Sequence, residues 1–275
     1  MERGLRVTLA VVGLLLAAVI ILPLVIPIPS EGEALLPQEL ADEDSRFIEV
    51  KGLDVHYKQA GQGGTPLLLL HGFGSHTFTW RNVLGPLGDG RQVFAFDRPG
   101  FGLTERPMPP FNGPNPYSQS AQAQLTVDLI DEMGFEEVVL VGNSAGGTIA
   151  LLTSLNYPGR VSALVLVDPA VYMGSGSPSW ARPLMALPQV RRLGPLLARN
   201  IRDWGVDMIG FAWHDPSRIT PDVVPGYKLP LRIKDWDRAL YEFTLASETL
   251  DLPSRLAELE MPVLVITGDD DRIVP

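Results

Sequence analysis

The chain has 275 residues, of which 45% are hydrophobic and 20% charged, with a net charge of −10 and no cysteine. This length fits one large domain or two small ones, and the composition is that of a globular protein. The acidic balance, without a stripe of clustered Lys and Arg, excludes an electrostatic surface for nucleic acid. The absence of cysteine excludes disulfides, thiolate zinc sites, iron–sulfur clusters and a cysteine nucleophile.

The first feature in chain order is an apolar run. Residues 7–28 carry no charge, and a helix of that length, at about 1.5 Å per residue, spans the ~30 Å hydrocarbon core of a bilayer. A buried core helix is the alternative, but it would be amphipathic, whereas this run is apolar all round. Arg3 and Arg6 precede the run, so the positive-inside rule predicts a cytoplasmic N-terminus and places the rest of the chain on the outer side.

A cleaved signal peptide is the other alternative, and it would make the protein secreted. The apolar region of a signal peptide is typically about 7–15 residues and ends at small residues. Here the run is longer and ends among prolines. The pattern therefore favours an uncleaved single-pass anchor over residues 1–29, followed by an acidic linker over residues 30–45.

Beyond the linker, short apolar runs alternate with helical patterns. Two alternating runs around Gly52 predict an antiparallel hairpin, and continuous apolar runs are typical of strands buried on both faces. The alternation predicts an α/β fold, with a mostly parallel sheet and helices on both faces. The predicted strands are 46–51, 53–59, 66–71, 91–97, 137–141, 162–167 and 262–267; the predicted helices are 80–87, 118–133 and 145–157, with a long loop at 98–117.

Residues 172–250 interrupt this alternation. They hold many prolines, no buried-strand pattern, and four of the five tryptophans, namely Trp180, Trp204, Trp213 and Trp236. We expect a helical cap inserted between two parts of the core, residues 46–171 and 251–275. Because tryptophan buries a large apolar area, these rings form the core of the cap, an apolar wall over a pocket, or both.

One motif predicts chemistry. The sequence Gly142-Asn143-Ser144-Ala145-Gly146 stands between a predicted strand and a predicted helix. In that context Gly-x-Ser-x-Gly predicts a sharp turn that needs small flanking residues and lifts the serine hydroxyl clear of the sheet. The turn also sets the hydroxyl at a helix N-terminus, which favours developing negative charge. Ser144 is the candidate nucleophile; an idle serine in a glycine-rich turn is the alternative.

Five segments together resemble the α/β-hydrolase superfamily, in its group of esterases, carbon–carbon bond hydrolases, dehalogenases and epoxide hydrolases. The resemblance implies the α/β-hydrolase fold over residues 46–275, with the cap in its usual place, and no cofactor. Dehalogenases and epoxide hydrolases of this group have aspartate where this chain has Ser144. The serine therefore favours attack on esters, thioesters, lactones, amides or carbon–carbon bonds beside a ketone, or peracid formation. The matching segments are residues 67–75, 94–104, 138–147, 164–169 and 264–275.

The loop His71-Gly72-Phe73-Gly74 follows the predicted strand 66–71. At this place an α/β-hydrolase supplies the second backbone N–H of its oxyanion hole, so Phe73 and Ala145 are the expected donors. His71 and Gly72 would support the loop. Catalysis by His71 as a base, and an ordinary glycine turn, are the alternatives.

The resemblance places the catalytic acid in Gly268-Asp269-Asp270-Asp271, at Asp271, where it would orient a histidine. Asp269 and Asp270 are competitors, and a solvated acidic turn is the alternative. We expect no metal, because the spacing fits no calcium loop and no histidine is near in the sequence.

The histidine of the triad normally follows the acid, but all four histidines of the chain precede Asp271. We expect the catalytic histidine to lie past Pro275 in a longer protein, so that this stretch alone is close to inactive and residues 262–267 form an uncovered sheet edge. His214, in the cap, is an alternative base. We expect His56 to be a surface or strand residue, and His76, Trp180 and Trp213 to be the candidate pocket residues.

These patterns predict a membrane-anchored serine hydrolase, carboxylesterase-like, that acts on a small apolar ester. A carbon–carbon bond hydrolase of ring-cleavage products is the first alternative. A non-catalytic hydrolase-like domain that binds a ligand or partner at the membrane is the second.

Overall fold

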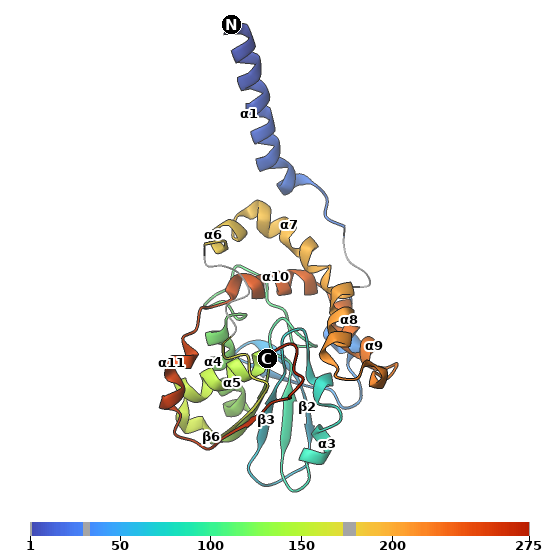
Figure 1. Cartoon of the computed structure of the whole chain (residues 1–275), viewed down its shortest axis with the longest axis vertical. Coiled ribbons are helices and arrows are strands. Elements are labelled where there is room, and N and C mark those ends of the chain that lie inside the picture. Colours follow the sequence, from blue (N-terminus) through green and yellow to red (C-terminus); the bar gives the residue numbers. More distant parts are fainter. Residues whose placement is uncertain (1, 30–33, 173–179, 275) are drawn as a thin grey trace.

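The computed structural model describes residues 2–29, 34–172 and 180–274. Helix α1 (Glu2–Val25) projects away from the folded domain (Figure 1). Within the described residues, the stretch Arg3–Val25 is the one helix long and apolar enough to cross a membrane, with a mean hydropathy of 2.8 and nothing of that window buried. The helix ends at Val25, earlier than the apolar run itself, because the residue before Pro27 is disfavoured in helical conformation.

The segment predicted as an acidic linker packs against the domain over residues 34–45. It contains the short helix α2 (Pro37–Leu40), and Lys58 pairs with Asp42 at 2.5 Å. Leu35 forms a parallel bridge with Ile233 of the cap, in which the Leu35 N–H donates to the Arg232 carbonyl at 3.1 Å. This part of the connection therefore touches both the core and the cap.

The core is built on a mostly parallel sheet with the strand order β1-β2-β4-β3-β5-β6-β7. β1 pairs with β2, and β2 with β4, in antiparallel fashion, whereas the other pairs are parallel. The predicted hairpin and parallel sheet are confirmed. The strands are β1 (Arg46–Val50), β2 (Leu53–Ala60), β3 (Leu67–Leu70), β4 (Val93–Phe96), β5 (Val138–Asn143), β6 (Val161–Val167) and β7 (Val263–Ile266).

Side chains of β3 alternate between two hydrophobic clusters, as the two-residue period of a strand requires. Leu68 and Leu70 belong to the larger cluster, which contains residues of α4 (Gln119–Glu132) and α5 (Ala145–Asn156). Leu67 and Leu69 belong to the smaller cluster on the other face. The sheet is therefore covered on both faces, as the sequence predicts.

The predicted helix over residues 80–87 is wrong. The chain forms a 3₁₀ turn at Thr77–Trp80 and a single α-helical turn, α3 (Leu84–Leu87). Residues 85 and 86 are Gly and Pro and residue 88 is Gly, and both residue types are unfavourable inside helices. This segment still covers the smaller cluster, through Trp80, Leu84 and Leu87.

The cap is helical over its described part, which begins at Trp180, and residues 173–179 lie outside the description. Helix α7 packs on α10, where the Gly194 backbone meets the Tyr241 ring so closely that a Cβ would lie 2.0 Å from it. Arg191 pairs with Glu242, and Arg199 with Asp237 at 2.8 Å, across the same contact. The cap helices are α6 (Arg182–Met185), α7 (Pro188–Ala198), α8 (Ile201–Ala212), α9 (Val223–Lys228) and α10 (Trp236–Ala246), and α11 (Leu252–Arg255) leads back to the core.

Candidate active site

Ser144 lies at the turn between β5 and α5, with φ 51° and ψ −121°. A positive φ is strained for any residue with a Cβ and persists only where the surroundings hold it. The Ser144 N–H donates to the Val167 carbonyl at 3.0 Å, and the Ser144 carbonyl accepts from the Ala170 N–H at 3.1 Å. The end of β6 and the loop behind it therefore fix the turn from one side.

The glycines of the motif let three backbone segments meet at this turn. A Cβ on Gly142 would lie 2.6 Å from the Gly146 carbonyl oxygen, and a Cβ on Gly146 would lie 2.2 Å from the Leu70 carbonyl oxygen. Neither position accepts a side chain without a backbone shift. The Gly-x-Ser-x-Gly pattern is thus explained by contacts with β3, and not only by the turn itself.

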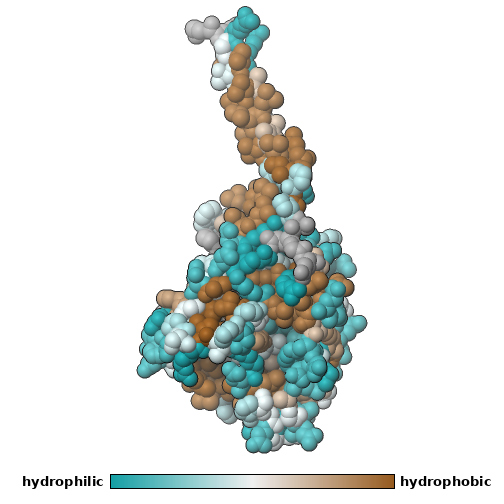
Figure 2. All heavy atoms as spheres, turned by 90° about the vertical axis from the view of Figure 1, so that its right-hand side faces the viewer, coloured by the Kyte–Doolittle hydropathy of each residue, from teal (hydrophilic) through white to brown (hydrophobic). Residues whose placement is uncertain are grey.

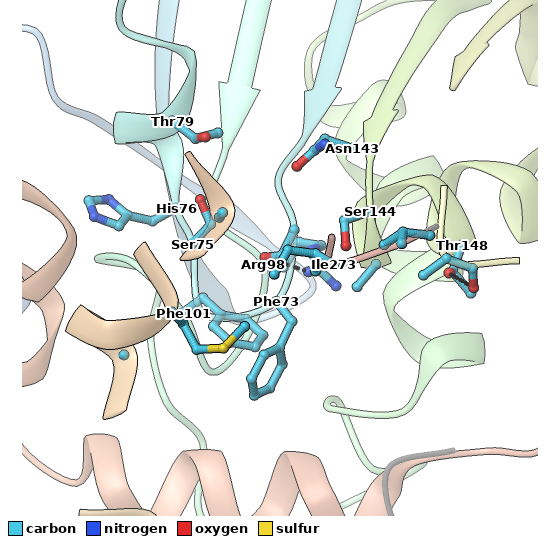
Figure 3. A pocket seen from close by; sticks show the side chains of 18 of the residues that line it. Phe73, Ser75, His76, Thr79, Arg98, Phe101, Asn143, Ser144, Thr148 and Ile273 are labelled. Atoms are coloured by element: carbon cyan, nitrogen blue, oxygen red, sulfur yellow. Dashed lines mark hydrogen bonds between the residues drawn. The ribbon is translucent and has the colours of Figure 1, made fainter. Parts of the chain in front are cut away.

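The loop after β3 passes directly over Ser144. A Cβ on Gly72 would lie 3.3 Å from the Ser144 Cβ. Among the described residues, neither the Phe73 N–H nor the Ala145 N–H donates to a protein acceptor. Figure 3 shows Phe73 and Ser144 around the same cavity, with Asn143 beside them. The two N–H groups are free to bind an oxyanion held near Ser144.

His71 supports this loop with both ring nitrogens. Nδ1 donates to the Gly72 carbonyl at 2.8 Å, and Nε2 accepts from the Arg98 N–H at 3.0 Å, an assignment that follows from the partners. Burial, followed by the nearby Arg98 cation, lowers the pKa of His71 to about 3. A neutral ring with both nitrogens engaged has no nitrogen left to accept the Ser144 proton, so His71 acts as a brace in this geometry.

The Arg98 side chain also fixes the loop after β3. Its guanidinium donates to the Gly72 carbonyl at 3.2 Å and to Gln122 at 2.8 Å. Burial lowers the pKa of Arg98 to about 9. Arg98 therefore contacts His71 through its backbone N–H and Gly72 through its side chain.

The sequence did not point to the buried pair His56–Asp97. His56 lies on β2, as expected, but it is buried and not on the surface, with Nδ1 at 2.7 Å from Asp97. Asp97 also accepts from the N–H groups of Thr77 at 2.6 Å and Leu103 at 2.7 Å. Burial raises the pKa of Asp97, but the charge and hydrogen bond of His56 outweigh burial and hold it below its usual value.

This pair orders loops and does not line the cavity that holds Ser144. The sequence feature that could indicate the buried Asp97 is Gly102, because a Cβ at that position would lie 1.9 Å from the Asp97 carboxyl carbon. A glycine five positions after an aspartate at a strand end is the pattern that could have indicated this contact.

The loop after β7 brings the predicted acid to the cavity. Asp269, Asp270 and Asp271 all line it. Asp271 accepts from the N–H groups of Ile273 at 2.7 Å and Val274 at 2.9 Å, so its carboxylate is held by its own turn. Figure 3 shows Ile273 close to Ser144, which places this loop opposite the nucleophile turn.

Asp270 points to other partners. It pairs with His214 at 2.5 Å and with Arg272 at 2.7 Å. The hydrogen bond from His214, followed by that from Arg272, lowers the pKa of Asp270. The contact between His214 and Asp270 joins the residues that follow the C-terminal end of α8 to the loop after β7. It lies at the exposed rim of the cavity.

The cavity has a volume of about 1060 Å³ and lies between core and cap. His76 and Trp213 line it, together with Trp204 and Trp236. Trp180 does not line it and is 72% exposed, which corrects the expectation for this ring. The reason is position: Trp180 precedes α6, at the end of the cap away from the core.

His76 connects the two parts of the molecule. Its Nε2 lies 3.0 Å from the Gly226 carbonyl of α9, and its ring stacks on Phe78. Burial lowers the pKa of His76. Among the described residues, no group of three or more acidic, histidine or cysteine side chains is arranged to hold a metal ion.

Comparison with known proteins identifies the fold's family. A family model for the alpha/beta hydrolase fold matches residues 65–275. The chain belongs to this family.

Relatives of this alpha/beta hydrolase are 28–30% identical to it. The hydrolase YugF of Bacillus subtilis is 28% identical over 233 residues, which are 84% of this chain and 82% of that protein. A 2-hydroxy-6-oxononadienedioate/2-hydroxy-6-oxononatrienedioate hydrolase of Comamonas testosteroni is 30% identical over 84% of this chain and 81% of its own. Both support a hydrolase.

One solved structure also covers the N-terminal helix. A bacterial membrane phospholipase A has a TM-score of 0.64 and 24% identity, and the match covers 100% of this chain and 84% of that protein. At this identity the likeness shows the fold alone.

Proposed function

We propose that this alpha/beta hydrolase is a membrane-anchored serine hydrolase that cleaves carboxylic esters with an apolar acyl or alcohol part. The observation that carries the proposal is the strained turn at Ser144, which opens into a cavity beside the free N–H groups of Phe73 and Ala145. Strain of this kind persists where function requires it.

In the proposed mechanism, the Ser144 Oγ attacks the ester carbonyl carbon and the carbonyl π electrons move to oxygen. The N–H groups of Phe73 and Ala145 bind that oxyanion. A histidine takes the serine proton and returns it to the leaving alcohol, and Asp271 holds that histidine in the correct tautomer. Water then attacks the acyl-enzyme by the same route and releases the acid.

The order of the triad in this fold, Ser then acid then His, puts the base after Asp271. His56 and His71 use both ring nitrogens in contacts that hold loops, and the His76 ring contacts the Gly226 carbonyl of α9. His214 pairs with Asp270 and is the alternative base.

The cavity wall supports an apolar substrate. Phe73, Phe101 and Phe243 form one aromatic cluster with ring centroids 5.0–5.7 Å apart. Trp204 and Trp213 add to the apolar lining. An uncharged acyl chain placed against these rings is removed from water, which favours binding.

Helix α1 supports attachment to a membrane, because its length and hydropathy suit a bilayer. With Arg3 and Arg6 at its start, we propose a cytoplasmic N-terminus and a hydrolase domain on the outer side. Secretion after cleavage of the segment is the alternative.

Hydrolysis of carbon–carbon bonds is a second candidate. The relative that is 30% identical acts, by its name, on a dienedioate, which carries carboxylates. The cavity wall of this chain also holds Arg98 and Arg106, whose cations suit a carboxylate. The same nucleophile would serve both reactions.

The test uses the full-length protein in detergent micelles or nanodiscs. We expect a serine-directed fluorophosphonate to label the wild type and Ser120→Ala, a surface control, but not Ser144→Ala. We expect Ser144→Ala to lower the hydrolysis of nitrophenyl esters by at least about 10³-fold.

Activity that survives Ser144→Ala would refute the proposed nucleophile. Turnover of a vinylogous diketone without turnover of esters would replace the ester proposal by the carbon–carbon alternative. Absence of phosphonate labelling in the wild type would favour a binding domain.

A further inference from the structure

The outer face of cap helices α6 and α7 is apolar and exposed, although these helices are firmly packed on their inner face. The inner face is fixed on α10 through Gly194 and through the pairs of Arg191 and Arg199. On the outer face, Leu184 is 54% and Leu197 is 76% exposed. Leu187 and Val190 are exposed beside them. We call these four leucine and valine residues the outer cap face.

This face lies against the end of α1. The Gln189 side chain donates to the Ile20 carbonyl at 3.2 Å, and Arg192 donates to the Ile26 carbonyl at 3.3 Å. Figure 1 shows α7 between α1 and the rest of the domain, and Figure 2 shows α1 as a hydrophobic stalk. If α1 spans a bilayer, its last turn leaves the hydrocarbon at the level of α7.

The charge around the outer cap face is opposite to that of the whole chain. Residues 182–202 contain five arginines and no aspartate or glutamate, in a chain with a net charge of −10. The structure neutralises Arg191 and Arg199 with carboxylates of α10. Within the described residues, Arg192 has no carboxylate partner and donates to the Ile26 carbonyl, whereas the Nε and Nη2 atoms of Arg182 are buried. Cations beside exposed leucines are the composition of helices that lie on anionic lipid surfaces.

An aromatic residue borders the same end of the cap. Trp180, which directly precedes α6, is 72% exposed. Trp and Tyr are favoured at the level of lipid headgroups, where an apolar ring with a polar atom meets both phases. This gives the exposure of Trp180 a physical reason that the cavity does not provide.

We infer that the outer cap face docks on the surface of the bilayer that α1 spans, with its leucines in the headgroup–acyl boundary and Arg192 among anionic headgroups. The inference rests on the proposed anchoring by α1 and adds a second membrane contact to it. A bilayer is the occupant that suits this face, because Gln189 and Arg192 of α7 contact the end of α1, and the Arg192 charge beside the face is positive.

The absence of cysteine permits a direct test with single-cysteine variants of the full chain. A spin label at Leu197→Cys or Leu184→Cys reports the face, one at Val12→Cys reports α1, and one at Asp89→Cys reports an exposed loop at the far end of the sheet. The protein is placed in nanodiscs of phosphatidylcholine, alone or mixed with phosphatidylglycerol. Depth is measured from collisions with oxygen and with a water-soluble nickel chelate.

We expect the Leu197→Cys and Leu184→Cys labels to lie about 5–10 Å inside the headgroup–acyl boundary in the mixed bilayer, and the Asp89→Cys label to remain in water. We expect Arg192→Gln to reduce the inserted fraction in the mixed bilayer to the level seen in phosphatidylcholine alone.

Labels at Leu197 and Leu184 that remain in water, while the Val12→Cys label is inserted, would overturn this inference and leave the anchor intact. A Val12→Cys label in water would overturn both. Equal insertion in the two lipid mixtures, unaffected by Arg192→Gln, would overturn the role assigned to Arg192.

Discussion

Strands β3 and β7 have almost the same composition and opposite surroundings. β3 reads Leu-Leu-Leu-Leu and β7 reads Val-Leu-Val-Ile, each after a proline. All four residues of β3 are buried, whereas those of β7 are 41–56% exposed. Among the described residues, β3 lies between β4 and β5, whereas β7 pairs with β6 alone. Apolar composition thus predicts that a segment is a strand, while its place in the sheet decides whether it is buried.

The same contrast divides the candidate site. The Ser144 side is built on β3 and β5, and buried contacts of His71 and Arg98 fix its loop. The Asp271 side is built on the end of β7, and Asp271 is held by the N–H groups of its own turn. One half of the site is determined by the core, and the other half by a local turn on an exposed edge.

The largest expected effect is on the Asp271 side. We predict that Asp271→Asn lowers kcat for ester hydrolysis about 10³–10⁴-fold, because a carboxamide cannot hold the catalytic histidine in the required tautomer. Asp270→Asn is the matched control and should change kcat less than about threefold, because Asp270 pairs with exposed His214 and Arg272. Steady-state kinetics on the full-length enzyme measures both, and the reverse order of effects would assign the acid to Asp270.

The next prediction compares the loss of stability caused by two matched substitutions, one in the buried strand β3 and one in the exposed strand β7. Leu69→Ala in β3 should lower the free energy of unfolding by about 2–5 kcal/mol, because it leaves a cavity in the core. Leu264→Ala in β7 should lower it by less than about 1 kcal/mol, because that side chain is largely in solvent. Urea unfolding followed by circular dichroism measures both values. Equal losses would show that β7 is covered in solution.

The last prediction concerns the pH dependence that His71 gives to stability. Its pKa in the folded protein, about 3, lies below the usual value of about 6.5 in the unfolded chain. The unfolded state therefore binds the proton more tightly, so the stabilisation is fully present above about pH 6.5 and is lost as the pH falls toward 3. The loss is about 1 kcal/mol per pH unit.

Unfolding free energies measured at several pH values in this window check the prediction. His71→Asn should reduce the slope by about that amount, whereas Leu69→Ala should lower stability at every pH and keep the slope. An unchanged slope in His71→Asn would mean that the ring is protonated in the folded state.

Much of the fold could be predicted from local pattern. The hairpin, the order of buried strands and helices, and the serine turn follow from two-residue and helical periodicity and from glycine spacing. The helix predicted at residues 80–87 failed because Gly85, Pro86 and Gly88 outweighed its apolar pattern. The pair His56–Asp97 was missed because its members are 41 positions apart, and no local pattern reports such a contact.

The sequence by itself determined the parts of this hydrolase that depend on neighbouring residues: the strand–turn–helix around Ser144, the apolar α1, and the helical character of the cap. Only the tertiary structure decided which tryptophans face the cavity, that His71 has no free nitrogen, and that Asp270 pairs with His214. Those outcomes depend on segments far apart in the chain that meet when the sheet assembles. Periodicity records which face of a segment is apolar, whereas the partner of that face is set by the packing of the whole molecule.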